Sequence, residues 1–238
     1  MYKLVVSGFD NVLINSDEAI STSTILEIDR VRNSGILFTI LCDRGYKEVL
    51  EYNKDFSFVD YIISCNGACL YNTKTNEVMI DKNLDYTIVK DLINNLNGYN
   101  LFIITATGRK DVFTIVDEKI YMVEVECNSK RDANKLLDII NSFELNIKTF
   151  MRKAGKKYYL QVVNSFVNSN DILEKIGNID FSSVVLICSE EKDALFYEKV
   201  GYKVAVSNAS SNVKKICDKT TSSNDNKGVK KILSNLFK

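Results

Sequence analysis

The sequence predicts an α/β protein in which a doubly wound parallel sheet is interrupted by a second, α+β domain. Short β-branched runs alternate with helix-like segments near both ends of the chain, an order that is typical of parallel sheets with right-handed crossovers. In the middle of the chain the pattern changes to helices mixed with antiparallel strands. With 238 residues, of which 45% are hydrophobic, the chain is long enough to bury two small cores.

The first third of the chain alternates buried strands with helices. Runs of β-branched residues predict the strands, whereas apolar side chains at helical spacing, such as Ile25 and Ile28, predict the helices. Gly35 is expected to end the first helix. In chain order we expect strand Tyr2–Val6, helix Thr24–Ser34, strand Ile36–Leu41, helix Lys47–Tyr52 and strand Tyr61–Ile63.

A change of pattern marks the inserted domain. A polar turn separates the apolar runs Ala68–Tyr71 and Glu77–Ile80, which predicts a hairpin. The insert, residues 83–165, is predicted to be α+β because helices and antiparallel strands are mixed within it. Its expected elements are helix Tyr86–Leu96, strands Leu101–Thr105, Asp111–Val116 and Tyr121–Glu126, helix Arg131–Phe143, and strands Lys148–Arg152 and Lys157–Val163.

The end of the chain returns to the α/β pattern. Residues 1–82 and 166–238 are therefore predicted to form one core domain that the insert interrupts. The expected elements are helix Asn170–Ile176, strand Ser183–Cys188, helix Asp193–Val200, strand Lys203–Val206, helix Asn212–Cys217 and helix Gly228–Phe237.

Composition excludes several classes of function. The chain has no histidine, so a histidine base, a histidine metal ligand and a Ser-His-Asp triad are all ruled out. A net charge of zero argues against a general nucleic-acid binder. No apolar run approaches the ~18–20 residues that span a bilayer, so no membrane partner is expected. With no secretory leader and six cysteines in no CxxC pattern, a cytoplasmic protein with reduced thiols is the expectation.

Four ordered stretches resemble the haloacid dehalogenase superfamily, and specifically its Cof-type phosphatases. They are KLVVSGFDNVLINSDEAIS, ILFTILCDRGY, YIISCNGACLYN and VVLICSEEKDALFYEKVGYKVAVSNAS. The resemblance covers nearly the whole chain and implies a Rossmann-like core with a mobile cap. It also implies hydrolysis of phosphate esters through an aspartyl-phosphate intermediate, in which one carboxylate attacks phosphorus and a second, two residues later, serves as acid and base.

The residues at the catalytic positions of that family are altered in this chain. The nucleophile position falls on Gly8, which has no side chain, while the acid/base position keeps its carboxylate in Asp10. The Thr or Ser that would bind phosphoryl oxygens is Cys42, followed by Asp43, and the phosphate-binding Lys falls at or near Asn168. Asp10 fits either an acid or a side chain that merely orders its loop.

The metal positions are altered as well. The resemblance implies Mg²⁺ bound by hard oxygen ligands in active relatives, and the corresponding positions here are Gly8, Asp10, Ser189 and Asp193. Because two of these four lack a carboxylate, we expect no metal and no other cofactor. Asp193 fits either a residual ligand or a charge favoured at a helix N-terminus.

Two further segments have a structural and a functional interpretation. Asn66 and Gly67 are predicted to shape a tight turn, with backbone amides that could face a ligand. Thr105–Arg109 resembles the second family motif in wording, but it lies inside the predicted insert. We interpret it as a strand that ends in a glycine turn, with Arg109 as an alternative substrate-facing cation.

Three hypotheses about function remain open at this level. The first is a phosphatase-like pseudoenzyme that has lost phosphoryl transfer and binds a small phosphorylated ligand or a protein partner. The second is an active Mg²⁺-dependent hydrolase of small phosphate esters that attacks with water. It would use Asp10 as the base and a rearranged metal site in which Glu190 or Glu191 binds the metal. The third is a structural or interaction module, which predicts an apolar surface patch or a stable oligomer.

Overall fold

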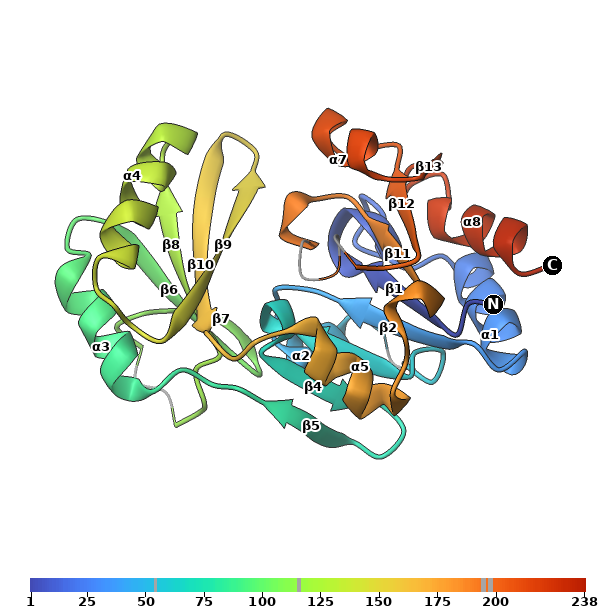
Figure 1. The fold of residues 1–238 in the computed structure, drawn as a ribbon, viewed down its shortest axis with the longest axis horizontal. Coiled ribbons are helices and arrows are strands. Elements are labelled where there is room, and N and C mark those ends of the chain that lie inside the picture. Colours follow the sequence, from blue (N-terminus) through green and yellow to red (C-terminus); the bar gives the residue numbers. More distant parts are fainter. Residues whose placement is uncertain (54, 115–116, 194–195, 197–198) are drawn as a thin grey trace.

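The computed structural model, which describes residues 1–53, 55–114, 117–193, 196 and 199–238, contains two sheets (Figure 1). The larger sheet has eight strands in the order β13-β12-β11-β1-β2-β3-β4-β5, and the smaller has five in the order β7-β6-β8-β10-β9. The predicted α/β architecture, with a parallel core sheet and a second α+β layer, is therefore confirmed.

The core sheet is parallel through its centre and antiparallel at one edge. Strand β1 pairs in parallel with both β2 and β11, whereas β4 and β5 form the predicted hairpin beside β3. Because β1 and β11 are covered on both faces, every one of their residues is buried. The strands are β1 Leu4–Gly8, β2 Leu37–Leu41, β3 Tyr61–Ser64, β4 Cys69–Asn72, β5 Glu77–Asp81, β11 Val184–Cys188, β12 Tyr202–Val206 and β13 Lys219–Thr221.

Helices cover both faces of the core sheet, and α1 packs beside α8 near the two chain termini (Figure 1). The helices of the core are α1 Thr22–Asn33, α2 Tyr46–Glu51, α5 Ser169–Gly177, α7 Ser211–Ile216 and α8 Gly228–Leu236. Single turns follow three of the strands: a π-type turn at Phe9–Leu13 and 3-10 turns at Cys65–Gly67 and Glu191–Asp193. A further 3-10 turn, Phe181–Ser183, precedes β11.

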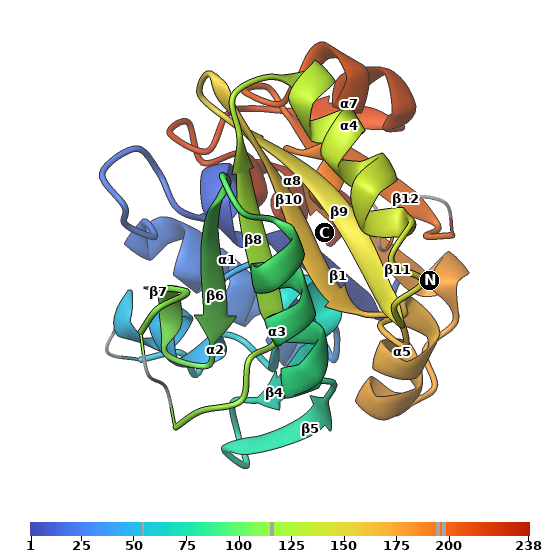
Figure 2. The same ribbon diagram turned by 90° about the vertical axis from the view of Figure 1, so that its left-hand side faces the viewer.

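The second sheet, which we call the cap, is entirely antiparallel and carries two helices on one face (Figure 2). Side chains that alternate along β8 and β10, such as Val123 and Leu160, pack under these helices, and the opposite face turns toward the core. The elements are α3 Tyr86–Asn95, β6 Asn100–Thr105, β7 Gly108–Asp111, β8 Met122–Cys127, α4 Lys130–Asn141, β9 Ile147–Ala154 and β10 Lys157–Asn164. The domain boundaries at residues 83 and 165 stay a prediction.

Three elements differ from the sequence-based expectation or fall outside it. The strand expected at Asp111–Val116 is wrong over residues 111–114, and residues 115–116 lie outside the described residues. Strand β7 is Gly108–Asp111, because Gly108, at φ 118°, closes a tight turn that pairs it with Thr105. Strand β13 was not expected, since its residues are polar and lie at a sheet edge. The helix expected at Asp193–Val200 falls mostly outside the described residues.

Among the helices in the described part of the chain, none combines the length and the apolar character that a bilayer-spanning helix needs.

Gly45 lets the cap approach the core. It precedes α2, and the amide of Lys47 in that helix donates a hydrogen bond of 3.0 Å to the carbonyl of Ala106 in the cap. A Cβ atom at Gly45 would lie 2.2 Å from the carbonyl oxygen of Thr105 and 2.3 Å from that of Ala106. Since both are backbone atoms, no side-chain rotation could relieve the clash.

We therefore expect Gly45→Ala to loosen the cap from the core. The substitution should lower the free energy of unfolding by about 1–3 kcal/mol, the usual range for overpacking. Thermal denaturation measures this loss, and limited proteolysis should cleave the connections near residues 83 and 165 faster than in the parent. Lys47→Ala, at an exposed position of the same helix, is the control and should change neither measurement. Equal stability of Gly45→Ala and the parent would contradict the packing argument.

Candidate functional site

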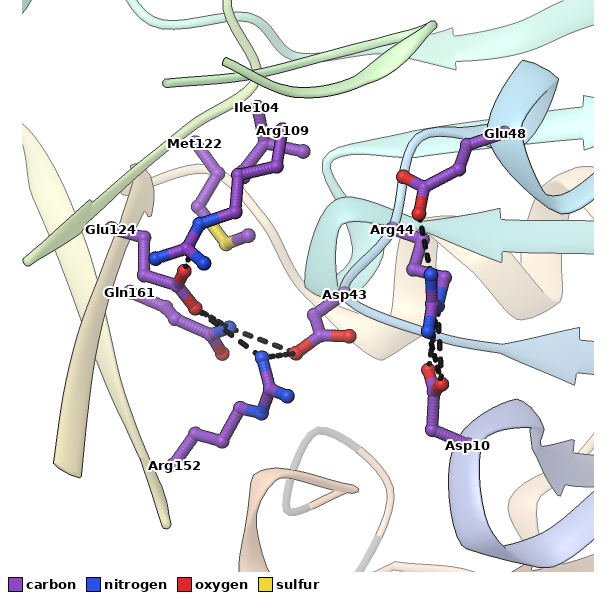
Figure 3. Close-up of a pocket in the computed structure, with 10 residues that line it drawn as sticks. All are labelled: Asp10, Asp43, Arg44, Glu48, Ile104, Arg109, Met122, Glu124, Arg152 and Gln161. Atoms are coloured by element: carbon purple, nitrogen blue, oxygen red, sulfur yellow. Dashed lines mark hydrogen bonds and ion pairs between the residues drawn. The ribbon is translucent and has the colours of Figure 1, made fainter. Parts of the chain in front are cut away.

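The ends of several core strands meet beneath the inner face of the cap. Gly8 ends β1, Cys42 follows β2, Cys65 follows β3 and Ser189 follows β11. Because parallel strands end at the same edge of a sheet, these loops gather there, where open α/β folds place their sites. Figure 3 shows side chains of the cap and of the core converging on this edge.

A polar pocket of about 200 Å³ lies between the two domains at this edge. Charged side chains from both domains dominate its wall, and they form two groups of ion pairs that Figure 3 separates clearly. The pocket is lined by Asp10, Asp43, Arg44, Glu48, Ile104, Arg109, Met122, Glu124, Arg152 and Gln161.

The first group belongs to the core and centres on Arg44. Its guanidinium donates to both carboxylate oxygens of Asp10, at 2.8–3.2 Å, and to Glu48 at 2.5 Å. Burial opposes the charge of Arg44, but the hydrogen bonds and charges of Asp10 and Glu48 outweigh it and raise the pKa of the guanidinium. Asp10 is thus held in a fixed orientation as the partner of a permanent cation.

The second group joins the core to the cap through Asp43. One carboxylate oxygen of this buried residue accepts a hydrogen bond of 2.9 Å from Gln161 and lies 3.1 Å from the guanidinium of Arg152. Burial disfavours the charge of Arg152, and the carboxylates of Asp43 and Glu124 reverse that effect, so that the pKa of Arg152 is raised. Core and cap therefore share one buried ion-pair network.

Arg109 extends this network within the cap. Its Nε atom lies 3.0 Å from Glu124, and its guanidinium carbon stacks 3.6 Å from the ring centroid of Phe102. The side chain lines the pocket, so the structure places it where the alternative interpretation of Thr105–Arg109 expected a cation. The turn that precedes it is the predicted glycine turn.

The space next to Gly8 is occupied by Val12. Gly8 has φ −53° and ψ 148°, a conformation open to any residue, so the backbone does not require glycine. A Cβ atom at Gly8 would nevertheless lie 2.9 Å from a methyl carbon of Val12. The position that would carry a nucleophilic carboxylate thus lacks the side chain, and a branched neighbour fills part of the room for it.

The donors near Ser189 do not fit a magnesium ion. Mg²⁺ requires several hard oxygen ligands in octahedral geometry. Here the Ser189 hydroxyl donates to the carbonyl of Asp10 at 3.5 Å, and the Asp193 carboxylate accepts from the amides of Ser189 and Glu190 at 3.4 and 3.5 Å. No group of three acidic or thiol side chains within the described residues could hold a metal ion.

A second, larger pocket of about 580 Å³ opens beside the first, and Arg152 lines both. Three cationic side chains, from α4 and β9, face two glutamates and several amide and hydroxyl groups of the core. The pocket is lined by Asn11, Lys130, Met151, Arg152, Lys153, Tyr158, Ser189, Glu190, Glu191, Asn208, Ser210 and Asn212.

Comparison with known proteins decides the family. The sequence profile of the haloacid dehalogenase-like hydrolases matches residues 5–151 and 110–233, two overlapping segments that together span most of the chain. The chain belongs to the haloacid dehalogenase-like hydrolases. Within them it is of the Cof type, and one of its structural neighbours is described as a sugar phosphatase of subclass IIB.

Individual relatives are distant but cover the full length. A 5-amino-6-(5-phospho-D-ribitylamino)uracil phosphatase of Bacillus subtilis, YitU, is 21% identical over 98% of this chain and 97% of its own. A haloacid dehalogenase-like hydrolase from Bacteroides thetaiotaomicron superposes with a TM-score of 0.80 at 20% identity, over 100% of both chains. The subclass IIB sugar phosphatase BT4131 superposes with a TM-score of 0.77 at 15% identity, over 98% of both chains.

Cys42, Asn66 and Gly67, which the sequence also predicted for the site, form local hydrogen bonds and a turn in this haloacid dehalogenase-like fold. The Cys42 thiol donates to the carbonyl of Arg44 at 3.7 Å, and Asn66 donates to Gln161 of the cap at 2.9 Å. Asn66 and Gly67 form the predicted tight turn, with φ of 54° and 96°. The backbone N–H of Asn66 donates a hydrogen bond to the carbonyl of Cys42, so it is not directed into the pocket.

Asn168 lies away from both pockets. It precedes α5, where its side chain accepts a hydrogen bond from the amide of Asp171 at 2.9 Å and donates to the carbonyl of Phe166 at 3.0 Å. Neither pocket is lined by it. The local role of Asn168 is therefore to cap a helix.

Sequence reasoning missed the polar residues that the cap contributes. Glu124 and Gln161 are buried, and each interrupts an otherwise apolar strand, as in Val123-Glu124-Val125 and Leu160-Gln161-Val162. A polar side chain that interrupts a buried strand needs a partner, and this signal is readable from the sequence. Arg44 was part of a quoted motif, but its pairing with Asp10 joins positions 34 residues apart.

Introducing a carboxylate at position 8 should not by itself produce phosphatase activity. We expect Gly8→Asp to lower the melting temperature, because its Cβ meets the Val12 methyl group, and to release no phosphate from p-nitrophenyl phosphate with Mg²⁺. The double variant Gly8→Asp/Val12→Ala should recover much of the lost stability and remain inactive, since Ser189 still lacks a carboxylate. Differential scanning fluorimetry and phosphate release are the measurements. Turnover by Gly8→Asp at an unchanged melting temperature would contradict this account.

Removing the Arg44 guanidinium should lower the free energy of unfolding, because Asp10 and Glu48 lose their cationic partner. Arg44→Gln leaves the carboxylates of Asp10 and Glu48 without their shared cation, and should cost about 1–3 kcal/mol in a partly buried setting. Urea denaturation measures the change. Arg30→Gln, which breaks a more exposed pair with Glu27, is the matched control and should cost less than about 1 kcal/mol. Equal effects of the two variants would show that the Arg44 pairs are no stronger than surface pairs.

Proposed function

We propose that this haloacid dehalogenase-like protein binds a small phosphorylated ligand between core and cap without hydrolysing it by the aspartyl-phosphate route. The observation that carries the proposal is the pair Gly8 and Val12. The first offers no nucleophile, and a methyl group of the second lies 2.9 Å from where a Cβ atom at position 8 would be. A covalent intermediate needs an attacking side-chain oxygen at that position.

The arrangement around Asp10 and Ser189 also supports the loss of hydrolysis. Family catalysis would need Mg²⁺ to neutralise the developing phosphoryl charge, and the donors present do not fit that ion. Asp10 is engaged by Arg44, and its carbonyl accepts a hydrogen bond from Ser189. The retained acid/base carboxylate would therefore have neither a nucleophile nor a metal to work with.

The larger pocket supports retained binding. Lys130 and Lys153 of the cap supply cations at its rim, while Asn11, Asn208 and Asn212 of the core supply amides. Lysine and amide groups suit a phosphate and a polar remainder, respectively. The phosphoribityl compound in the name of the relative YitU belongs to the same chemical class, which favours a phosphorylated ligand over a protein partner.

A combined binding and turnover experiment tests the proposal. A panel of sugar phosphates and nucleotides is screened by thermal shift with either MgCl₂ or EDTA, and each compound is then assayed for phosphate release. We expect at least one compound to raise the melting temperature by about 5 °C at 100-fold above its Kd, equally in MgCl₂ and EDTA, with no release of phosphate. Lys130→Ala/Lys153→Ala should reduce that shift.

The controls separate the competing hypotheses. Lys135→Ala, on α4 but outside the residues that line the pocket, should keep the parent shift. Mg²⁺-dependent turnover that Asp10→Asn abolishes would overturn the proposal in favour of an active hydrolase. The absence of any shift across the panel would refute ligand binding and favour the interaction module.

A further inference from the structure

Two cysteine side chains meet beside the site. Cys188 is the last residue of β11 and is buried, while Cys217 follows α7 and is partly exposed. Their sulfur atoms are 3.8 Å apart although the residues are 29 positions apart in the sequence. None of the functions considered above uses this pair.

The fold fixes this proximity through β12. Cys188 pairs with Ala205 across the sheet, and its thiol donates to the carbonyl of Val204 at 3.6 Å. After α7 the chain returns to the same strand, where the amide of Asp218 donates to the carbonyl of Lys203 at 2.9 Å. Cys217 therefore arrives beside Cys188 by backbone pairing and not by a chance side-chain rotamer.

Cys217 differs from the other cysteines for which a pKa shift is resolved. The hydrogen bond from Cys188 lowers the pKa of Cys217, and Lys203 adds to this, against burial and the charges of Asp218 and Asp193. Burial instead raises the pKa of Cys69 and of Cys127 to about 11, and that of Cys65 well above its usual value. A thiolate is the reactive form, so Cys217 is the thiol most available to an oxidant among those with a resolved shift.

We propose that Cys188 and Cys217 are an oxidation site at which a peroxide closes an intramolecular disulfide. The Cys217 thiolate attacks one peroxide oxygen, so that an S–O bond forms, the O–O bond breaks and the leaving oxygen takes up a proton as water. The Cys188 thiol then loses its proton and attacks the resulting sulfenic sulfur; the S–S bond forms and the S–O bond breaks, releasing a second water. The two thiols are oxidised, and one peroxide is reduced to two waters.

Closing the bond requires the two sulfur atoms to move together. A disulfide is about 2.05 Å long, so the sulfur atoms must approach by about 1.8 Å from their present contact of 3.8 Å. Cys217 lies at an exposed helix end, which can shift to supply the approach. The bond would tie the end of β11, directly before Ser189, to the helix α7 that carries Asn212, and both Ser189 and Asn212 line the larger pocket.

Peptide mapping of the oxidised protein tests the proposal. The full-length protein is treated with a small excess of hydrogen peroxide, alkylated under denaturing conditions and digested with trypsin. We expect four alkylated cysteines, a mass loss of about 2 Da and one cross-linked pair, made of the peptide with Cys188 and the peptide with Cys217. Dithiothreitol should reverse the bond, and the oxidised form should melt at least about 5 °C higher because the cross-link restricts the unfolded chain.

The remaining cysteines serve as internal controls. Cys42, Cys65, Cys69 and Cys127 should all stay alkylatable, and Cys217→Ser, at a partly exposed position, should give no cross-link and no rise in melting temperature. Stable addition of oxygen to Cys217 while Cys188 remains alkylatable would overturn the proposal. A cross-link between any other pair, or six alkylated cysteines after treatment, would do so as well.

Discussion

The buried carboxylate of Asp43 is the contact on which the rest of the site depends. Asp43 follows strand β2 of the core. Its carboxylate accepts a hydrogen bond from Gln161 and forms an ion pair with Arg152, two residues of the cap. Removing one partner of such a buried pair typically costs about 3–5 kcal/mol, because the remaining charge is left without compensation. This ion pair therefore helps to hold the cap sheet over the strand ends, together with the hydrogen bonds from Lys47 to Ala106 and from Asn66 to Gln161.

The altered catalytic positions form a consistent set. At the expected nucleophile position, Gly8 has no side chain, and a methyl group of Val12 lies in the space beside it. At an expected metal position, the hydroxyl of Ser189 donates a hydrogen bond to the carbonyl of Asp10. Each change is accompanied by a neighbour that uses the space or the hydrogen bond that the change leaves open. Such neighbours limit the loss of stability, since unfilled space and unsatisfied polar groups are destabilising.

Local patterns in the sequence predict secondary structure, whereas contacts between distant positions cannot be predicted from them. Buried parallel strands such as β1 and β11 could be predicted because continuous apolar runs are a local property. Gly8 and Ser189 also lie in recognisable stretches, and their assignment to catalytic positions of the family stays a prediction. The strand β7 was misplaced, because a turn closed by Gly108 decides its pairing and its polar sequence carries no β pattern. The link between Asp43 and Gln161 spans 118 positions, a distance over which one sequence offers no pairing rule.

The loss of hydrolysis that we propose depends on the donors at the strand ends, which do not suit a divalent cation. Isothermal titration of MgCl₂ into the metal-free protein tests it directly and needs no substrate. We predict no saturable heat up to about 10 mM Mg²⁺ and an unchanged melting temperature, in the parent and in Asp193→Asn alike. Saturable Mg²⁺ binding by the parent that Asp193→Asn abolishes would contradict the claim.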